Sequence, residues 1–263
     1  MKANYHTHTT RCQHAEGTDE AYVQAALDAG FDELGFSDHA PWPFSSGFVS
    51  NIRMPMAELP GYIASVRALR EKYRGRLPIY LGLESEYFPR YRDHLLRLRE
   101  MGITYLILGQ HYVDSEEENP YIGLECQTDE GILSYADAVT EAIRTGMFLY
   151  LAHPDLFMRH RRAEQFDKAC ERASDIICQA AKEAGMPIEY NLLGLRNELD
   201  GHSRGYPSDP FWAYVKRYGN DVVLGTDAHR PSLLTDAELW AEGRKRVLDM
   251  GYNLLDHLKM EEE

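Results

Sequence analysis

The sequence predicts an α/β fold in which about seven βα units surround a parallel sheet. Short apolar runs alternate with longer segments of helical periodicity, which is the pattern of βα units. Glycines follow most of the helical segments, where the backbone often turns left-handed and a residue without Cβ is favoured. The length of 263 residues suits one barrel-sized domain over residues 1–263, and no linker or low-complexity tract divides it.

The strand and helix candidates follow one another in regular order. Short apolar runs predict strands at residues 3–8, 33–37, 79–84, 105–109, 147–152, 187–191 and 221–225. Helical periodicity predicts helices at residues 18–29, 56–73, 91–101, 130–144, 162–184, 210–218 and 233–250. The segments 41–55, 114–127 and 192–207 are expected to be loops, and the last two are too long and polar to be simple connections.

Composition limits the classes of function. The chain has 28 Lys and Arg against 42 Asp and Glu, a net charge of -14, which argues against general affinity for nucleic acid. There is no apolar run of about 18 residues and no signal-peptide pattern, so a soluble cytoplasmic protein without membrane contact is expected. The four cysteines show no C-x-x-C pair and are expected to be buried, reduced thiols.

Nine metal-capable side chains recur along the chain, most of them at the end of a predicted strand. They are His6, His8, His14, His39, Glu84, His111, His153, Asp227 and His229. In parallel barrels the carboxyl ends of the strands form the active-site face. Any one histidine alone is more often a surface or core residue, but repetition at successive strand ends favours a shared site. Imidazole and carboxylate ligands in this number predict a hydrolytic centre of two or three divalent ions.

Arginines and further histidines form a second group of candidates. Arg159, His160 and Arg161 follow His153, while Arg196, His202 and Arg204 lie in the segment 192–207. An arginine fork can hold a phosphate through two hydrogen bonds, so these residues beside metal ions predict an anionic phosphoryl substrate. His94 and His257, by contrast, lie in polar surroundings and are expected to be solvated.

The ordered motifs His6-Thr-His8, His14, Asp38-His39, Gly-x-Glu84, Gly-x-His111, His153-Pro and Thr-Asp227-x-His229 resemble the polymerase and histidinol phosphatase (PHP) superfamily. The resemblance covers nearly the whole chain. Residues 12–17, and the segment 193–196 followed by Gly205-Tyr206-Pro207, are similar to the histidinol-phosphate phosphatase branch in particular.

The resemblance implies a distorted (β/α)7 TIM-like barrel with three divalent metal ions, which are zinc, iron or manganese. The implied ligands are His6, His8, Glu84 and Asp227 for one ion, Glu84, His111 and His153 for a second, and His14, His39 and His229 for a third. Glu84 would bridge two ions. Asp38 is expected to support the ligands rather than join them, and Glu86 is a weaker ligand candidate.

The expected reaction is hydrolysis of a small phosphate monoester. A hydroxide held between two ions would attack phosphorus, and Asp227 or His202 would supply the proton to the leaving alcohol. The branch resemblance implies L-histidinol phosphate as substrate, in histidine biosynthesis. Its cationic groups could contact acidic residues of the loops, which are Asp114, Glu116, Glu117, Glu118 and Glu198. A solvated loop is the simpler interpretation of residues 116–118.

Two other functions stay open at this stage. A PHP-type phosphodiesterase or nucleotide phosphatase would keep the metal cluster, but it would favour a basic groove that this composition does not offer. A metal-stabilised accessory domain without activity is the non-enzymatic alternative. The complete ligand set argues against it, because structural metal sites usually close their coordination with four protein ligands around one ion.

Overall fold

The computed structural model describes residues 1–203 and 205–260, so Arg204 lies outside the described residues. All strand pairs are parallel and form two ladders. The first ladder contains β1 (Ala3–Asn4), β2 (Glu33–His39), β3 (Ile79–Ser85) and β4 (Tyr105–Leu108). The second contains β5 (Ile188–Asn191), β6 (Asp221–Gly225) and β7 (Asn253–Leu254).

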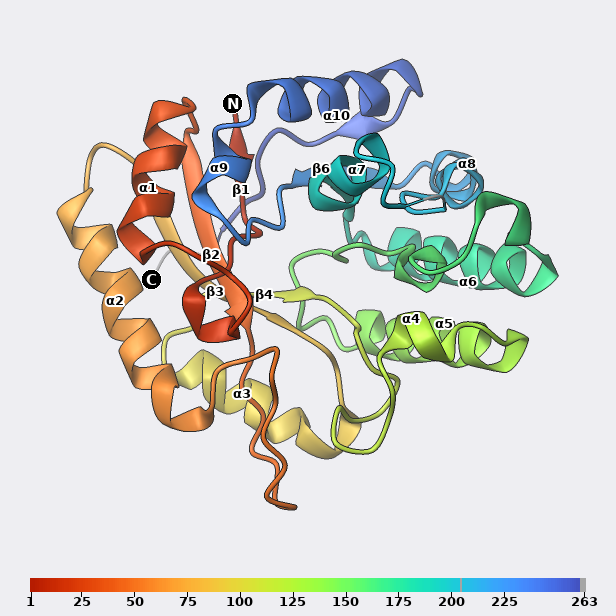
Figure 1. The fold of residues 1–263 in the computed structure, drawn as a ribbon, viewed down its shortest axis with the longest axis horizontal. Coiled ribbons are helices and arrows are strands. Elements are labelled where there is room, and N and C mark those ends of the chain that lie inside the picture. Colours follow the sequence, from red (N-terminus) through yellow and green to blue (C-terminus); the bar gives the residue numbers. More distant parts are fainter. Residues whose placement is uncertain (204, 261–263) are drawn as a thin grey trace.

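Isolated bridges join the two ladders on both sides. Leu151 bridges Leu108 beside β4 and also Ile188 in β5, while Thr7 bridges Ala228 just after β6. The parallel sheet therefore curls into a distorted barrel, and helices surround it on the outside (Figure 1). This confirms the predicted α/β fold class.

The strands differ from the prediction in three places. β1 ends at Asn4 although a strand was predicted over residues 3–8, and beyond it Thr7 forms only an isolated bridge. The segment 147–152 forms bridges at Leu151 in place of a regular strand, although its backbone pairs on both sides, as in the hydrogen bond from Glu189 N to Leu151 O at 2.8 Å. β7 was not predicted, because its two residues are partly exposed and form no apolar run.

The long helices lie close to their predicted positions. They are α1 (Asp19–Asp28), α2 (Leu59–Lys72), α3 (Arg92–Glu100), α5 (Asp129–Arg144), α6 (Lys168–Ala184), α8 (Asp209–Tyr218) and α10 (Ala237–Asp249). The helix predicted from residue 162 begins later, because the Asp167 side chain accepts hydrogen bonds from the amides of Ala169 and Cys170 and caps it there. In the part of the chain that the structure describes, no helix has both the length and the apolar character needed to cross a bilayer.

Two short helices lie where loops were expected: α4 (Ile122–Glu125) and α7 (Leu192–Leu199). A third, α9 (Pro231–Leu234), overlaps the start of the helix predicted at residues 233–250. α7 directly follows β5, and the Asn191 side chain accepts a hydrogen bond from Gly194 N at its start. This N-cap is the local signal that the loop prediction for 192–207 overlooked.

The barrel interior is filled below the candidate ligands by aromatic and aliphatic side chains. Alternation along β4 turns Tyr105 and Ile107 into one buried cluster and Leu106 and Leu108 into the other, which lies under the helices. The Tyr105 hydroxyl donates to the carbonyls of Tyr5 and Phe36, at 2.9 Å each. The amino end of the barrel is therefore a packed core, and the polar residues gather at its other end.

The expectation that His94 is solvated is wrong. It lies on α3 but is buried, because the segment after β2 packs over it and its Nε2 is 2.7 Å from the Pro41 carbonyl. Periodicity of one helix cannot reveal a loop that covers its outer face. His257 is exposed, as expected, and all four cysteines are free and buried.

Candidate metal centre

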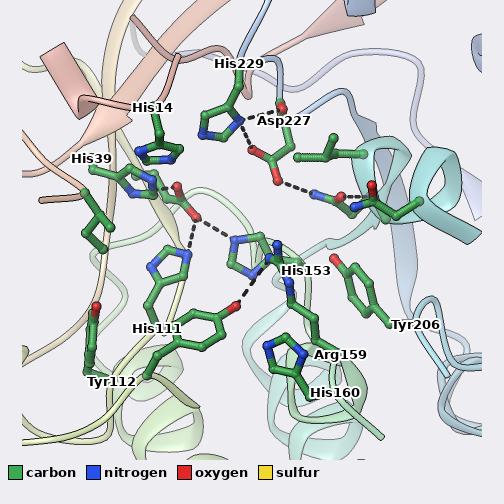
Figure 2. Close-up of a pocket in the computed structure, with 17 residues that line it drawn as sticks. His14, His39, His111, Tyr112, His153, Arg159, His160, Tyr206, Asp227 and His229 are labelled. Carbon is green, nitrogen blue, oxygen red and sulfur yellow. Dashed lines mark hydrogen bonds and ion pairs between the residues drawn. The ribbon is translucent and has the colours of Figure 1, made fainter. Parts of the chain in front are cut away.

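The nine predicted ligands meet at the carboxyl end of the barrel. Each lies in or directly after a strand, except for His153, which follows the bridged segment 147–152, and His14, which follows a short 3-10 helix after β1. Seven of them line one pocket, and Figure 2 draws them as a ring of imidazoles and carboxylates. The structure thus brings together side chains that are more than 200 residues apart in sequence, such as His6 and Asp227, 3.5 Å apart.

Glu84 lies at the centre of this group and is 1% exposed. Each of its two oxygens faces a different set of imidazoles. Its Oε2 lies within 3.4 Å of a nitrogen of His6, His8 and His39, and its Oε1 within 3.4 Å of a nitrogen of His111 and His153. A carboxylate placed between two sets of nitrogen donors has the arrangement that a bridging ligand requires.

Several groups of three side chains have ligand atoms within 4.8 Å of one another. Two of these groups lie within predicted ligand sets: His6, His8 and Asp227; and His14, His39 and His229. Two more overlap those sets: His6, Glu84 and His153; and His8, His39 and Glu84. Among the described residues, no such group includes His111, whose Nε2 lies 3.4 Å from Glu84 Oε1. A further group combines His8 and His229 with Cys12, a thiol that was not predicted to lie near the candidate ligands.

Divalent metal ions fit this donor set. In the described part of the chain, the buried Nε2 atoms of His6, His8 and His229 have no hydrogen-bond partner. Buried polar atoms are rarely left without partners, so these nitrogens indicate a missing ligand. Imidazole with carboxylate is the donor set that zinc, iron and manganese accept.

Glu189 supports two of the candidate ligands from below, and sequence reasoning missed it. Its carboxylate lies 2.7 Å from His6 Nδ1 and accepts from the His153 backbone amide at 2.9 Å. Gly225 leaves room for it, since a Cβ there would come within 1.7 Å of Glu189 Oε1. An acidic residue within the short apolar run 187–191 was the available signal.

Asp38 and Glu86 hold ligands from the side and from behind. Asp38 Oδ1 lies 3.5 Å from His8 Nδ1, in keeping with the supporting role expected for it. Glu86 accepts from His111 Nδ1 at 3.0 Å and pairs with the buried Arg53, so its carboxylate is engaged away from the pocket. Its geometry fits support of His111 better than a ligand role.

The backbone is strained at two of the candidate ligands. His153 has φ of 30° and Asp227 has φ of 48°, both in the left-handed region that side chains other than glycine rarely adopt. Such residues cost on the order of 1–3 kcal/mol each and gather at functional sites. Gly109 allows a close approach of another kind, because a Cβ there would lie 1.9 Å from Glu84 Oε1.

The charges in the cluster are strongly coupled. Burial alone would raise the pKa of Glu84, but the imidazoles of His111, His39 and His6 hold it well below its usual range. Burial lowers the pKa of His14 to about 4, with help from the neighbouring His229. Burial also opposes a charge on His8, yet the nearby carboxylates of Asp227, Asp38 and Glu84 raise its pKa to about 9.

The pocket above the ligands has a volume of about 430 Å³, which suits a small molecule. Its other side is formed by residues from loops, from α7 and, at Asn191, from the end of β5 (Figure 2). These residues are Ile52, Tyr112, Tyr121, Arg159, His160, Asn191, Leu193, Gly194, Asn197 and Tyr206.

The predicted substrate residues separate into two groups. Arg159 and His160 line the pocket, and Arg159 Nη1 donates to the Tyr121 hydroxyl at 3.3 Å. The other three do not line it: Arg161 binds Asp167 at the start of α6, Arg196 pairs with Asp236, and His202 is exposed.

The loop acids also lie away from the pocket, paired with arginines. Asp114 and Glu118 contact Arg90, and Glu198 contacts Arg246. The expectation that residues 116–118 are solvated is wrong for Glu116, which is buried and receives hydrogen bonds from Arg53 and Ser50. None of these acids lines the pocket.

Known proteins match this chain over most of its length. The PHP domain family matches residues 4–192. The protein of Deinococcus radiodurans named "Probable histidinol-phosphatase" is 31% identical over 251 residues, covering 94% of this chain and 92% of that protein. The histidinol-phosphatase of Bacillus subtilis is 26% identical and covers 88% of this chain and 94% of that protein.

A solved structure shares the fold. The histidinol phosphate phosphatase of Lactococcus lactis, crystallised with zinc, L-histidinol and phosphate, has a TM-score of 0.75 and 18% identity, covering 99% of both chains. The family match, the 31% identical relative and the strand-end cluster agree. The chain therefore belongs to the PHP domain family, in its histidinol-phosphatase branch.

Proposed function

We propose that this chain is a metal-dependent phosphatase that hydrolyses L-histidinol phosphate to L-histidinol and phosphate, a step of histidine biosynthesis. The observation that carries the proposal is the buried Glu84 carboxylate between five imidazoles, directly below a pocket that also contains Arg159. The histidinol-phosphatases that resemble the chain, one of them solved with zinc, L-histidinol and phosphate, support the choice of substrate.

The nine strand-end side chains would hold the divalent ions, as three ions with Glu84 as the bridge and with zinc, iron or manganese as candidates. Bound there, the ions would act as Lewis acids that polarise a phosphoryl oxygen and make water a better nucleophile.

Arg159 is the best-placed group for the phosphate itself. Its guanidinium lies at the pocket and can offer two parallel N–H groups to phosphoryl oxygens, where negative charge accumulates as the ester bond breaks. His160 lies beside it. The geometry supports these two residues more strongly than Arg161 or Arg196, which hold other parts of the chain.

Asp227 is the better-placed candidate for proton transfer. Burial would raise its pKa, but His6 and His229 hold the pKa well below its usual range, so Asp227 is ionised near neutral pH. As a base it can accept a proton from the attacking water and then return it to the leaving alcohol. His202, the other candidate, is exposed and outside the pocket lining.

We further propose that one domain spans residues 1–263 and that the protein works in the cytoplasm. Its four free cysteines accord with a reducing compartment.

A steady-state comparison of substrates tests the function. Metal-free protein is loaded separately with zinc, iron or manganese, and kcat/KM is measured for L-histidinol phosphate, for p-nitrophenyl phosphate and for a nucleoside bisphosphate. The proposal expects histidinol phosphate to be preferred at least about 100-fold, a difference of roughly 2.7 kcal/mol in transition-state stabilisation. A similar preference for the nucleotide would reassign the chain to the nucleotide phosphatases, and no turnover with any metal would favour an accessory role.

A further inference from the structure

Arg53 is a buried arginine that has no part in the proposed reaction. Its side chain is 1% exposed, and four of its five N–H groups donate hydrogen bonds. Nη1 and Nη2 contact the two oxygens of Glu86 at 3.1 and 2.8 Å, Nη1 also contacts the Ala40 carbonyl at 2.9 Å, and Nε contacts Glu116 at 2.6 Å. A guanidinium this far from water requires such partners, and here they come from three separate segments.

The Glu86 carboxylate connects Arg53 with a candidate metal ligand. Its Oε1 accepts from His111 Nδ1 at 3.0 Å, and its Oε2 accepts from Trp42 Nε1 at 3.0 Å. Because an ionised carboxylate only accepts, the proton of a neutral His111 ring lies on Nδ1 and the lone pair lies on Nε2. That Nε2 is the atom 3.4 Å from Glu84.

We propose that Arg53 is a positioning residue for His111, acting through Glu86, and that it sets the affinity of the metal position to which His111 belongs. The inference depends on the proposed ligand role of His111. A carboxylate behind a ligand histidine fixes its ring and makes the nitrogen more basic. The two-pronged contact from Arg53 fixes the plane of that carboxylate, which a lysine ammonium cannot do.

The same arginine ties the segment 41–55 to the metal centre. Ile52, the neighbour of Arg53 in sequence, lines the pocket. The backbone carbonyl of Arg53 accepts a hydrogen bond from the side chain of Gln13, next to His14, at 2.8 Å. Ser50 donates to Glu116 at 2.6 Å. A change at Arg53 therefore reaches His111 by way of Glu86, whereas a change at Glu116 weakens the contact at Arg53 Nε and leaves both contacts between Arg53 and Glu86 in place.

That difference supplies a matched pair of variants. Arg53→Lys keeps the charge and removes the fork, while Glu116→Gln weakens the other arm of the same guanidinium and leaves Glu86 on His111. Zinc affinity of the full-length, metal-free protein is measured by competition with a chromophoric chelator, and folding is checked by circular dichroism and thermal melting. We expect R53K to weaken the affected zinc position by about 10–100-fold and E116Q to leave it within about twofold.

A double-mutant cycle tests whether the effect passes through His111. In a His111→Asn background, R53K should change zinc affinity by less than about twofold, because its route to the metal is gone. Wild-type zinc affinity in folded R53K would overturn the proposal. So would an equal loss in E116Q, or an undiminished R53K effect in the H111N background, since each indicates a general structural role.

If R53K does not fold, Glu86→Gln takes its place. Its neutral amide removes the charge behind His111, and we expect the same loss of zinc affinity, so wild-type affinity in folded E86Q would equally overturn the proposal. Zinc affinity does not depend on turnover. A chain that binds zinc as described but leaves histidinol phosphate intact would refute the proposed function and not the role of Arg53. A chain that hydrolyses histidinol phosphate but whose zinc affinity does not respond to R53K would refute only the role of Arg53.

Discussion

The two sides of the pocket are built differently. The ligand side consists of the predicted metal ligands, seven of which line the pocket. Most of them come from strand ends and are buried, with His6 at 0% and Glu84 at 1% exposure. The substrate side consists of Tyr121, Arg159, His160, Asn197 and Tyr206, which come from loops and helix α7. Arg159 and His160 are exposed.

Their hydrogen bonding differs as well. On the ligand side, fixed partners hold several rings, such as Glu189 on His6 and Glu86 on His111. On the substrate side, Arg159 has a single hydrogen bond, to Tyr121, among the interactions described. The difference indicates a rigid side for metal and catalysis and an adaptable side for substrate, so changes on the two sides should affect different measured quantities.

The largest effect is expected at Glu84. Glu84→Ala removes the carboxylate that faces both sets of imidazoles, so metal content and activity should fall together. Since loss of an outer partner of a ligand alone costs about 10–100-fold, loss of this ligand should exceed about 100-fold in kcat/KM. Elemental analysis and steady-state kinetics measure the two quantities, with Glu100→Ala on the exposed end of α3 as control. Full metal content together with full turnover in E84A would show that Glu84 does not bridge metal ions.

A change on the substrate side should separate activity from metal binding. Arg159→Gln removes a charged donor aimed at the phosphate, and kcat/KM should fall by about 100-fold, as for loss of one preorganised donor. Metal content should stay at the wild-type level. Arg162→Gln, an exposed neighbour that does not line the pocket, is the control. Loss of metal in R159Q would contradict the division into two sides.

The same division explains what the sequence could predict. Strand-end positions are determined by the barrel itself, so the position of a candidate ligand such as His153 could be predicted although the segment before it is an irregular strand. Directions of loop side chains depend on contacts that no local pattern reveals. Arg196 pairs with Asp236 and Arg161 pairs with Asp167, and neither lines the pocket. His94 is covered by the segment after β2, which is distant in sequence.

The supporting carboxylate of Glu189 was another group that local patterns did not identify. Glu189 lies in a predicted strand, but its contact with His6 joins residues 183 positions apart. Glu189→Gln keeps the shape and removes the charge behind His6, so zinc affinity should fall by about 10–100-fold, less than for Glu84. Competition with a chelator measures it, and Glu183→Gln on the exposed face of α6 is the control. Unchanged affinity in E189Q would show that the His6 ring needs no charged support.

The smallest effect concerns pH and again contrasts two positions, both now on the ligand side. The pKa of His8 is about 9 in the metal-free protein, because its carboxylate partners outweigh burial, whereas burial lowers the pKa of His14 to about 4. Near pH 7, His8 is therefore protonated and His14 is neutral. Zinc must displace a proton from His8 but none from His14.

Zinc affinity of the His6, His8 and Asp227 group should consequently rise with pH below about 9, by about tenfold per pH unit for each proton released. Calorimetric titration in two buffers of different ionisation enthalpy measures the protons released. In His14→Asn, release should persist, and in His8→Asn it should fall by about one proton per chain. Protonation of His8 also affects the stability of the metal-free fold. Because the pKa of His8 is raised, its charged form stabilises the fold below about pH 6.5, and this contribution is lost as the pH rises through 9. Proton release that is unchanged in H8N would place the displaced proton elsewhere in the cluster.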